Sequence, residues 1–157
     1  MKRYLEYVKY PLIVLLLVFI GSLLTDDDTS GAKIEIVTKA VSAKLDDKGL
    51  APADNRMVKR LYGLNANDYE GLSLYVSDSN MKVEEFLIVK LKDVSQTDSV
   101  EAAVQARLDH QLESFEGYGP KQCKLLNDHI TDIQGNYLFY VVHKNAKAAD
   151  KAFQKSL

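Results

Sequence analysis

The sequence predicts an α+β protein in which an N-terminal transmembrane helix precedes one antiparallel sheet packed with helices. Residues 12–24 carry no charge and are mostly large apolar side chains, as in a membrane segment. Two pairs of strand-like segments, within residues 72–91 and 129–143, each surround a turn. Helical periodicity before, between and after these pairs gives the order α-α-β-β-α-β-β-α, which is typical of an α+β domain.

The first segment has the charge order of a membrane anchor. Lys2, Arg3 and Lys9 precede the apolar run, and three aspartates at 26–28 follow it. Thirteen helical residues cover roughly 20 Å, short of a hydrocarbon core of roughly 30 Å, but a helix beginning at Tyr4 is long enough. Residues 1–25 are therefore interpreted as a cytoplasmic stub and transmembrane signal anchor. The positive-inside rule then places the rest of the chain outside the cytoplasm, as a single-pass protein of the cell membrane.

Two alternatives to the anchor stay open. A cleaved signal peptide has an apolar region of about 7–15 residues, which fits, but Gly21, Ser22 and Thr25 have no small partner two residues away. A buried helix of a soluble protein is the other alternative. No cysteine lies directly after the apolar run, so the attachment residue of a lipoprotein is missing there.

The remainder divides into a polar acidic tether, residues 26–33, and an α+β domain, residues 34–157. Residues 26–157 hold seventeen basic and twenty-one acidic side chains, a net charge of −4. This average argues against nucleic acid or acidic lipid as a partner of the domain, because both favour a basic patch. The single cysteine, Cys123, excludes an internal disulfide.

The first half of the domain contains two helices and two strands. An apolar face predicts a helix over 36–45, and Asp54 and Gly63 are suited to cap a short helix over 57–62. Alternating apolar residues predict a half-buried strand over 72–76. The almost continuous apolar run at 85–91 predicts a central strand covered on both faces, with Lys90 turned toward water.

The second half begins with the longest helix. Asp98 and Glu101 resemble a capping box, and the helical repeat runs to Phe115. Pro120 suits the first turn of a short helix. A hairpin of strands 129–133 and 137–143 around 134–136, then a helix capped by Asn145, complete the domain. Such a sheet normally leaves part of one face or an edge open for binding.

No phosphate loop, dinucleotide fingerprint, zinc motif or nucleophile elbow occurs in the sequence. Cys123 with His129, or His129 with His143 and a neighbouring aspartate, are possible catalytic or metal-binding sets. The spacing supports neither set, so we assign no catalytic residue, no metal and no cofactor.

Four residues are candidates for binding a ligand or partner. Exposed tyrosines in loops and on open sheets are typical of recognition surfaces, which singles out Tyr69, Tyr75 and Tyr118. The fourth is Glu85, at the entrance of the second strand beside Glu84. Adjacent strand residues point to opposite faces, so these two carboxylates do not form an acid–base pair.

Several strings are similar to a known family: Arg60-Leu61-Tyr62-Gly63-Leu64, Asp68-Tyr69-Glu70-Gly71, the run 75–90, and Ser114-Phe115-Glu116-Gly117-Tyr118-Gly119-Pro120. The chain resembles an uncharacterised family of small membrane-anchored or lipoprotein-like extracytoplasmic proteins from clostridial Gram-positive bacteria. The resemblance covers residues 35–157 and brings no assigned catalytic residues. It implies an accessory role at the cell envelope.

These observations favour a membrane-anchored, non-enzymatic binding or accessory module of the bacterial cell envelope. Its expected partners are the membrane, through the N-terminal helix, and an envelope protein or polymer, but not nucleic acid. One alternative is an extracytoplasmic hydrolase or transferase using Cys123 or the pair His129/His143. The other is a small-ligand sensor, which needs a closed apolar pocket between sheet and helices.

Overall fold

A five-stranded antiparallel sheet forms the middle layer of the domain in the computed structural model, which describes residues 14–16, 29–45 and 49–157. Its strand order is β1-β2-β3-β5-β4. The strands are β1 (Leu50–Pro52), β2 (Gly71–Ser77), β3 (Glu85–Lys90), β4 (Ile130–Gln134) and β5 (Tyr137–Val142). The predicted α+β class with an antiparallel sheet is confirmed.

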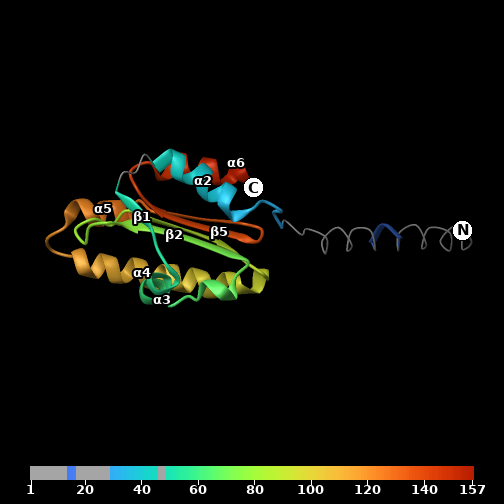
Figure 1. The fold of residues 1–157 in the computed structure, drawn as a ribbon, viewed down its shortest axis with the longest axis horizontal. Helices are drawn as coiled ribbons and strands as arrows, with labels where there is room; N and C mark the ends of the chain where they lie inside the picture. Colours follow the sequence, from blue (N-terminus) through green and yellow to red (C-terminus); the bar gives the residue numbers. More distant parts are fainter. Residues whose placement is uncertain (1–13, 17–28, 46–48) are drawn as a thin grey trace, which may run out of the picture.

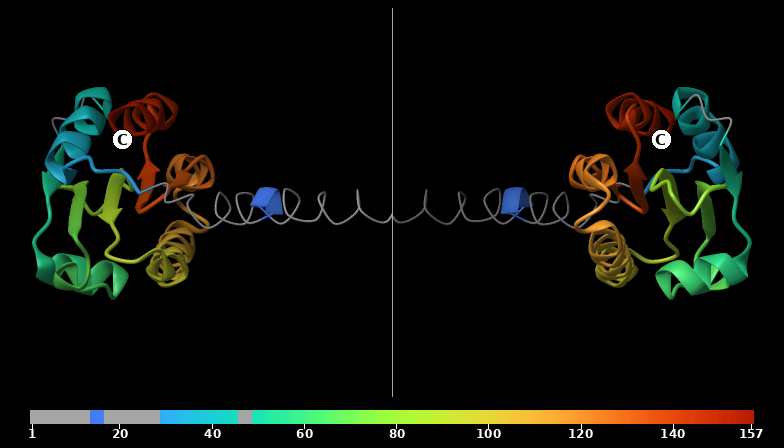
Figure 2. Two further views of the ribbon diagram at one scale, coloured as in Figure 1. Left: turned by 90° about the vertical axis from the view of Figure 1, so that its right-hand side faces the viewer. Right: turned by 90° about the vertical axis from the view of Figure 1, so that its left-hand side faces the viewer.

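Helices cover both faces of this sheet (Figure 1). Helices α2 (Ile34–Leu45) and α6 (Ala146–Ser156) lie side by side on one face, as Figure 2 shows from both sides. Helices α3 (Asn55–Tyr62) and α4 (Thr97–Phe115) lie on the other, and α5 (Pro120–Asn127) packs against α4. Short 3-10 turns, η1 (Ala66–Asp68) and η2 (Val94–Gln96), precede β2 and α4.

Two apolar cores fill the spaces between the layers. Leu74, Leu87 and Leu138 pack toward α3 and α4, whereas Phe86 and Phe139 pack toward α2 and α6. The expectation that part of one face or an edge stays open holds at the edge strands β1 and β4, which border on solvent, but helices cover both faces over the centre of the sheet. The reason is the long central strands β3 and β5, which are apolar on both faces and need cover on both.

Strand β1 was not expected from the sequence. It is three residues long and contains Pro52, so it shows no alternation. Proline is tolerated there because β1 is an edge strand, paired only with β2 through Ala51↔Val76 and its neighbours.

Strand β3 is central and fully buried, as predicted, but the expectation for Lys90 is wrong. Lys90 Nζ lies 2.7 Å from a carboxylate oxygen of Glu70 and 5.7 Å from the centre of the Tyr137 ring. Ion pairing and the aromatic face allow this ammonium group to be buried at the end of the sheet.

The caps follow the sequence prediction in α3 but not in α4. Asp54 accepts a hydrogen bond from the Met57 N–H at 2.9 Å, and Gly63 ends α3 at φ 68°. Asp98 and Glu101 are not the capping box, because the chain already turns in η2, where Asp93 and Gln96 form it. Asn145 precedes α6 as predicted, but its side chain donates to the Lys44 carbonyl, which links α6 to α2.

The predicted membrane anchor, residues 1–25, lies outside the described residues except for 14–16. Among the helices that the structure describes, none has the length and apolar character needed to cross a membrane.

Candidate functional site

A buried ion pair joins the sheet to α4 and forms the centre of the candidate site. Arg107 donates from Nη2 to Glu85 Oε2 at 2.8 Å and from Nε to Oε1 at 3.2 Å. The Glu85 side chain is 2% exposed and that of Arg107 is 15% exposed. The sheet register explains the contact, since Glu85 pairs with Val76 and Val142 and so points to the face that carries α4.

Two further side chains complete the hydrogen bonds of Glu85. The Tyr62 hydroxyl, from the last turn of α3, donates to Oε1 at 2.8 Å. The Gln111 amide, oriented to match its neighbours, donates to Oε1 at 3.2 Å and accepts from Arg107 Nη2 at 3.0 Å. Because three side chains saturate this carboxylate, Glu85 fixes the position of Arg107 and is not a free base.

The surroundings raise the pKa values of Tyr62, Arg107 and Tyr140, so these three groups stay protonated. Burial, followed by the charge of Glu85, raises the pKa of Tyr62 well above its usual value, so the phenol remains a donor. Burial lowers the pKa of Arg107, but its hydrogen bonds with Glu85 and the charge of Glu85 outweigh this effect and raise it. Burial also raises the pKa of Tyr140, whose hydroxyl has no hydrogen-bond partner among the described residues.

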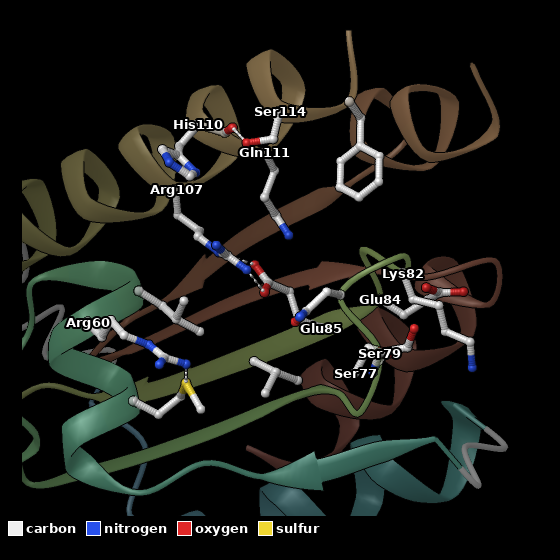
Figure 3. Close-up of a pocket in the computed structure, with 15 residues that line it drawn as sticks. Arg60, Ser77, Ser79, Lys82, Glu84, Glu85, Arg107, His110, Gln111 and Ser114 are labelled. Carbon is white, nitrogen blue, oxygen red and sulfur yellow. Dashed lines mark hydrogen bonds and ion pairs between the residues drawn. The ribbon is translucent and has the colours of Figure 1, made fainter. Parts of the chain in front are cut away.

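A cavity of about 260 Å³ opens above this ion pair (Figure 3). Its wall comes from α3, α4 and the β2–β3 turn. Polar lining residues are Arg60, Ser77, Ser79, Asn80, Lys82, Glu84, Glu85, Arg107, His110, Gln111 and Ser114. The cavity is smaller than the roughly 300–1,000 Å³ of typical small-molecule pockets, so it suits one group of a larger partner.

The charges in this cavity favour an acidic or hydroxyl-rich group. Its three cationic side chains, Arg60, Lys82 and Arg107, exceed its two carboxylates. Arg107 has N–H groups beyond those used by Glu85, and the serine hydroxyls can donate or accept. The arrangement can hold a ligand, but the carboxylate at the floor of the cavity, Glu85, is already occupied by its hydrogen bonds to Arg107 and Tyr62.

The structure places only one of the four predicted binding residues in this cavity, namely Glu85. Tyr69 is buried in the core beside α3 and α4. Tyr75 lies on the opposite sheet face, with its ring stacked on Phe86 at 4.7 Å. Tyr118 is 63% exposed in the α4–α5 connection, 5.6 Å from the Phe115 ring. The four residues do not form one site.

Each member of the alternative catalytic sets has a contact of its own. Cys123 packs at the margin of the apolar core, and His129 Nδ1 lies 2.7 Å from the Leu126 carbonyl oxygen. His143 Nδ1 instead accepts from the Asn145 N–H at the start of α6. No group of three or more His, Cys, Asp or Glu residues suited to a metal occurs in the part of the chain that the structure describes.

Sequence reasoning missed Arg107, which it treated only as a member of the helical repeat. A signal was present: Arg107 lies between Val104 and Leu108 on the mostly apolar stripe of α4. Glu85 likewise begins an otherwise apolar strand. Opposite charges at two positions expected to be buried indicate an ion pair.

Comparison with protein families identifies most of the domain. Residues 43–143 match the model of a family described as Domain of unknown function (DUF4358). The chain belongs to the DUF4358 family. The match includes every residue of the cavity and ends before α6. No curated protein and no solved structure matches the chain. The description of the DUF4358 family assigns it no biochemical function.

Proposed function

We propose that the protein is a membrane-anchored binding module of the cell envelope, without enzymatic activity, whose binding site is the cavity above Arg107. The observation that carries the proposal is the Glu85–Arg107 ion pair, which fixes a cationic group at the floor of a polar cavity. The site would receive one acidic or hydroxyl-rich group of an envelope protein or polymer. The apolar segment 12–24 supports the anchor, which would hold residues 34–157 outside the cytoplasm.

Site-specific photocrosslinking in living cells tests the cavity. His110 and Asp109 are adjacent, exposed residues of α4, but only His110 lines the cavity. A photoreactive residue in place of His110 should give a discrete crosslinked product, and the same residue in place of Asp109 should not. Arg107→Met should abolish the product. Equal crosslinking from both positions, or a product that survives Arg107→Met, would contradict this site.

Protease accessibility tests the location separately. Protease added to intact, wall-stripped cells should degrade residues 34–157 if the anchor is oriented as proposed. A domain that survives until the membrane is permeabilised would show that the anchor is absent or inverted.

A further inference from the structure

The solvent side of α2 and α6 forms a strongly basic surface, which we call the lysine layer. It comprises residues 33–45 and 144–157 and contains Lys33, Lys39, Lys44 and four lysines of the C-terminal segment: Lys144, Lys147, Lys151 and Lys155. Only Glu35 and Asp150 oppose them, so its net charge is +5. Residues 49–143 hold nine basic and fourteen acidic side chains, a net charge of −5. The acidic composition of the domain is therefore an average over two regions of opposite sign.

The lysines of this layer are available to a partner. All seven are exposed, and none forms an ion pair with another residue that the structure describes. Helices α2 and α6 lie side by side, so the charges share one surface (Figure 2). A shallow groove of about 570 Å³ between the helices has a floor of Ala40, Ala43, Ala148 and Ala152. These small side chains let an extended surface approach while the lysine ammonium groups reach its charges.

Hydrogen bonds hold the first residues of the described domain beside the C-terminal end of the lysine layer. The Ser30 hydroxyl donates to the Leu157 carbonyl at 2.9 Å, and the Ser30 N–H donates to Asn136 at 2.8 Å. The apolar run ends at Leu24, six residues before Ser30, a distance of at most about 20 Å along an extended chain. This step rests on the proposed anchor, which would keep the lysine layer close to the membrane.

We propose that the lysine layer docks the domain onto anionic phospholipid at the membrane surface. The cations of the layer are all lysines, with no arginine. A compact ammonium suits a diffuse array of phosphates, whereas the planar fork of arginine favours a fixed carboxylate or phosphate. Juxtamembrane lysine clusters bind anionic leaflets electrostatically, and the attraction is screened beyond about 10 Å at 0.1 M salt.

Amine acylation of the full chain in lipid nanodiscs tests this docking. Discs of phosphatidylcholine are compared with discs containing 30% phosphatidylglycerol, and mass spectrometry measures the acylation rate of each lysine. Lys147 and Lys151 should react about threefold more slowly on the anionic discs, and 0.5 M NaCl should remove the difference. Lys59 and Lys121, which are exposed outside the layer, should react equally on both.

A pair of triple variants provides the matched control. Lys147→Gln, Lys151→Gln and Lys155→Gln together should abolish the protection of Lys39 and Lys144 on anionic discs. Lys59→Gln, Lys92→Gln and Lys121→Gln together remove the same charge outside the layer and should leave that protection unchanged. Equal acylation of layer lysines on neutral and anionic discs would overturn the proposal. Protection by soluble polyphosphate on neutral discs but not by anionic lipid would assign the layer to a polymer instead.

The same samples distinguish failure of the docking from failure of the anchor. A chain that does not co-elute with neutral discs contradicts the proposed anchor. Co-elution with anionic discs alone, lost at 0.5 M NaCl, would still support the lysine layer.

Discussion

The two faces of the sheet place their charges in opposite ways. Toward α3 and α4, the interior contains the Glu85–Arg107 ion pair, and a cavity opens directly above it. Toward α2 and α6, the middle of the interior is apolar or aromatic, the buried Lys90–Glu70 ion pair lies at the end of the sheet, and the other charges lie outside as exposed lysines.

The difference shows how each face can serve recognition. A buried charge needs a partner of exact geometry, so the α3–α4 face fixes one cationic group in one position. An apolar interior needs no such partner, so the outer surface of α2 and α6 can accumulate charge of one sign without affecting the core. The first face suits a single chemical group, and the second suits an extended charged surface.

The largest loss of stability is expected from a substitution in the apolar core between the sheet and helices α2 and α6. Phe153 of α6 is fully buried, and its ring stacks on Phe139 at 4.9 Å. Phe153→Ala should lower the free energy of unfolding by about 3–5 kcal/mol, because it removes a ring and leaves a cavity. Urea denaturation followed by circular dichroism measures this. Tyr118→Ala, which truncates an exposed ring, should cost less than about 0.5 kcal/mol. Similar losses in both variants would mean that α6 does not depend on this core.

A smaller loss of stability, which a second substitution should reverse, is expected from breaking the ion pair between the sheet and α4. Arg107→Met should cost about 3 kcal/mol, the lower end for a broken buried pair, because it leaves Glu85 buried without its cation. Adding Glu85→Gln to this variant should recover most of the loss, since a neutral amide can still accept from Tyr62. A double-mutant cycle in urea measures the coupling. Additive losses would show that the pair does not act as a unit.

The sequence predicted those parts of the fold that depend on neighbouring residues. The caps of α3, the burial of β3 and the hairpin of β4 and β5 are local or follow from apolar patterning. Strand β1 is too short to show a pattern. The burial of Lys90 depends on Glu70, twenty residues earlier in the chain and brought close only by the β2–β3 pairing.

The candidate site was harder to predict, because its residues come from segments that are distant in the sequence. Glu85 was identified, but its partner Arg107 is twenty-two residues away and on a different element. Tyr69 is buried and Tyr75 is half-buried although tyrosine is common on recognition surfaces, because residue type alone does not determine exposure. The lysine layer combines two segments about a hundred residues apart, which the net charge of the whole domain concealed.

The smallest change in stability is expected from Asp150, whose carboxylate lies on the inner side of the lysine layer. Burial, followed by the hydrogen bond and charge of Asp132, raises the pKa of Asp150 to about 6. Gln154 donates to both carboxylates, at 2.9 Å to Asp132 and 3.2 Å to Asp150. The folded pKa exceeds the unfolded value of about 3.9, so the native state binds the proton more tightly. The stabilisation that the bound proton gives the folded state is complete below about pH 4 and is lost as the pH rises through 6.

Asp150→Asn should therefore stabilise the fold at pH 7, by at most about 1 kcal/mol because solvent screens a partly exposed group. It should have little effect at pH 4, and urea midpoints at the two values measure the difference. Asp109→Asn, at an exposed position of α4, is the control and should change stability by less than about 0.5 kcal/mol. The substitution also raises the net charge of the lysine layer to +6, so stability and attraction to anionic lipid should increase together at pH 7. A variant that gains stability without stronger protection of Lys147 would show that the charge of Asp150 does not oppose the attraction of the lysine layer to anionic lipid.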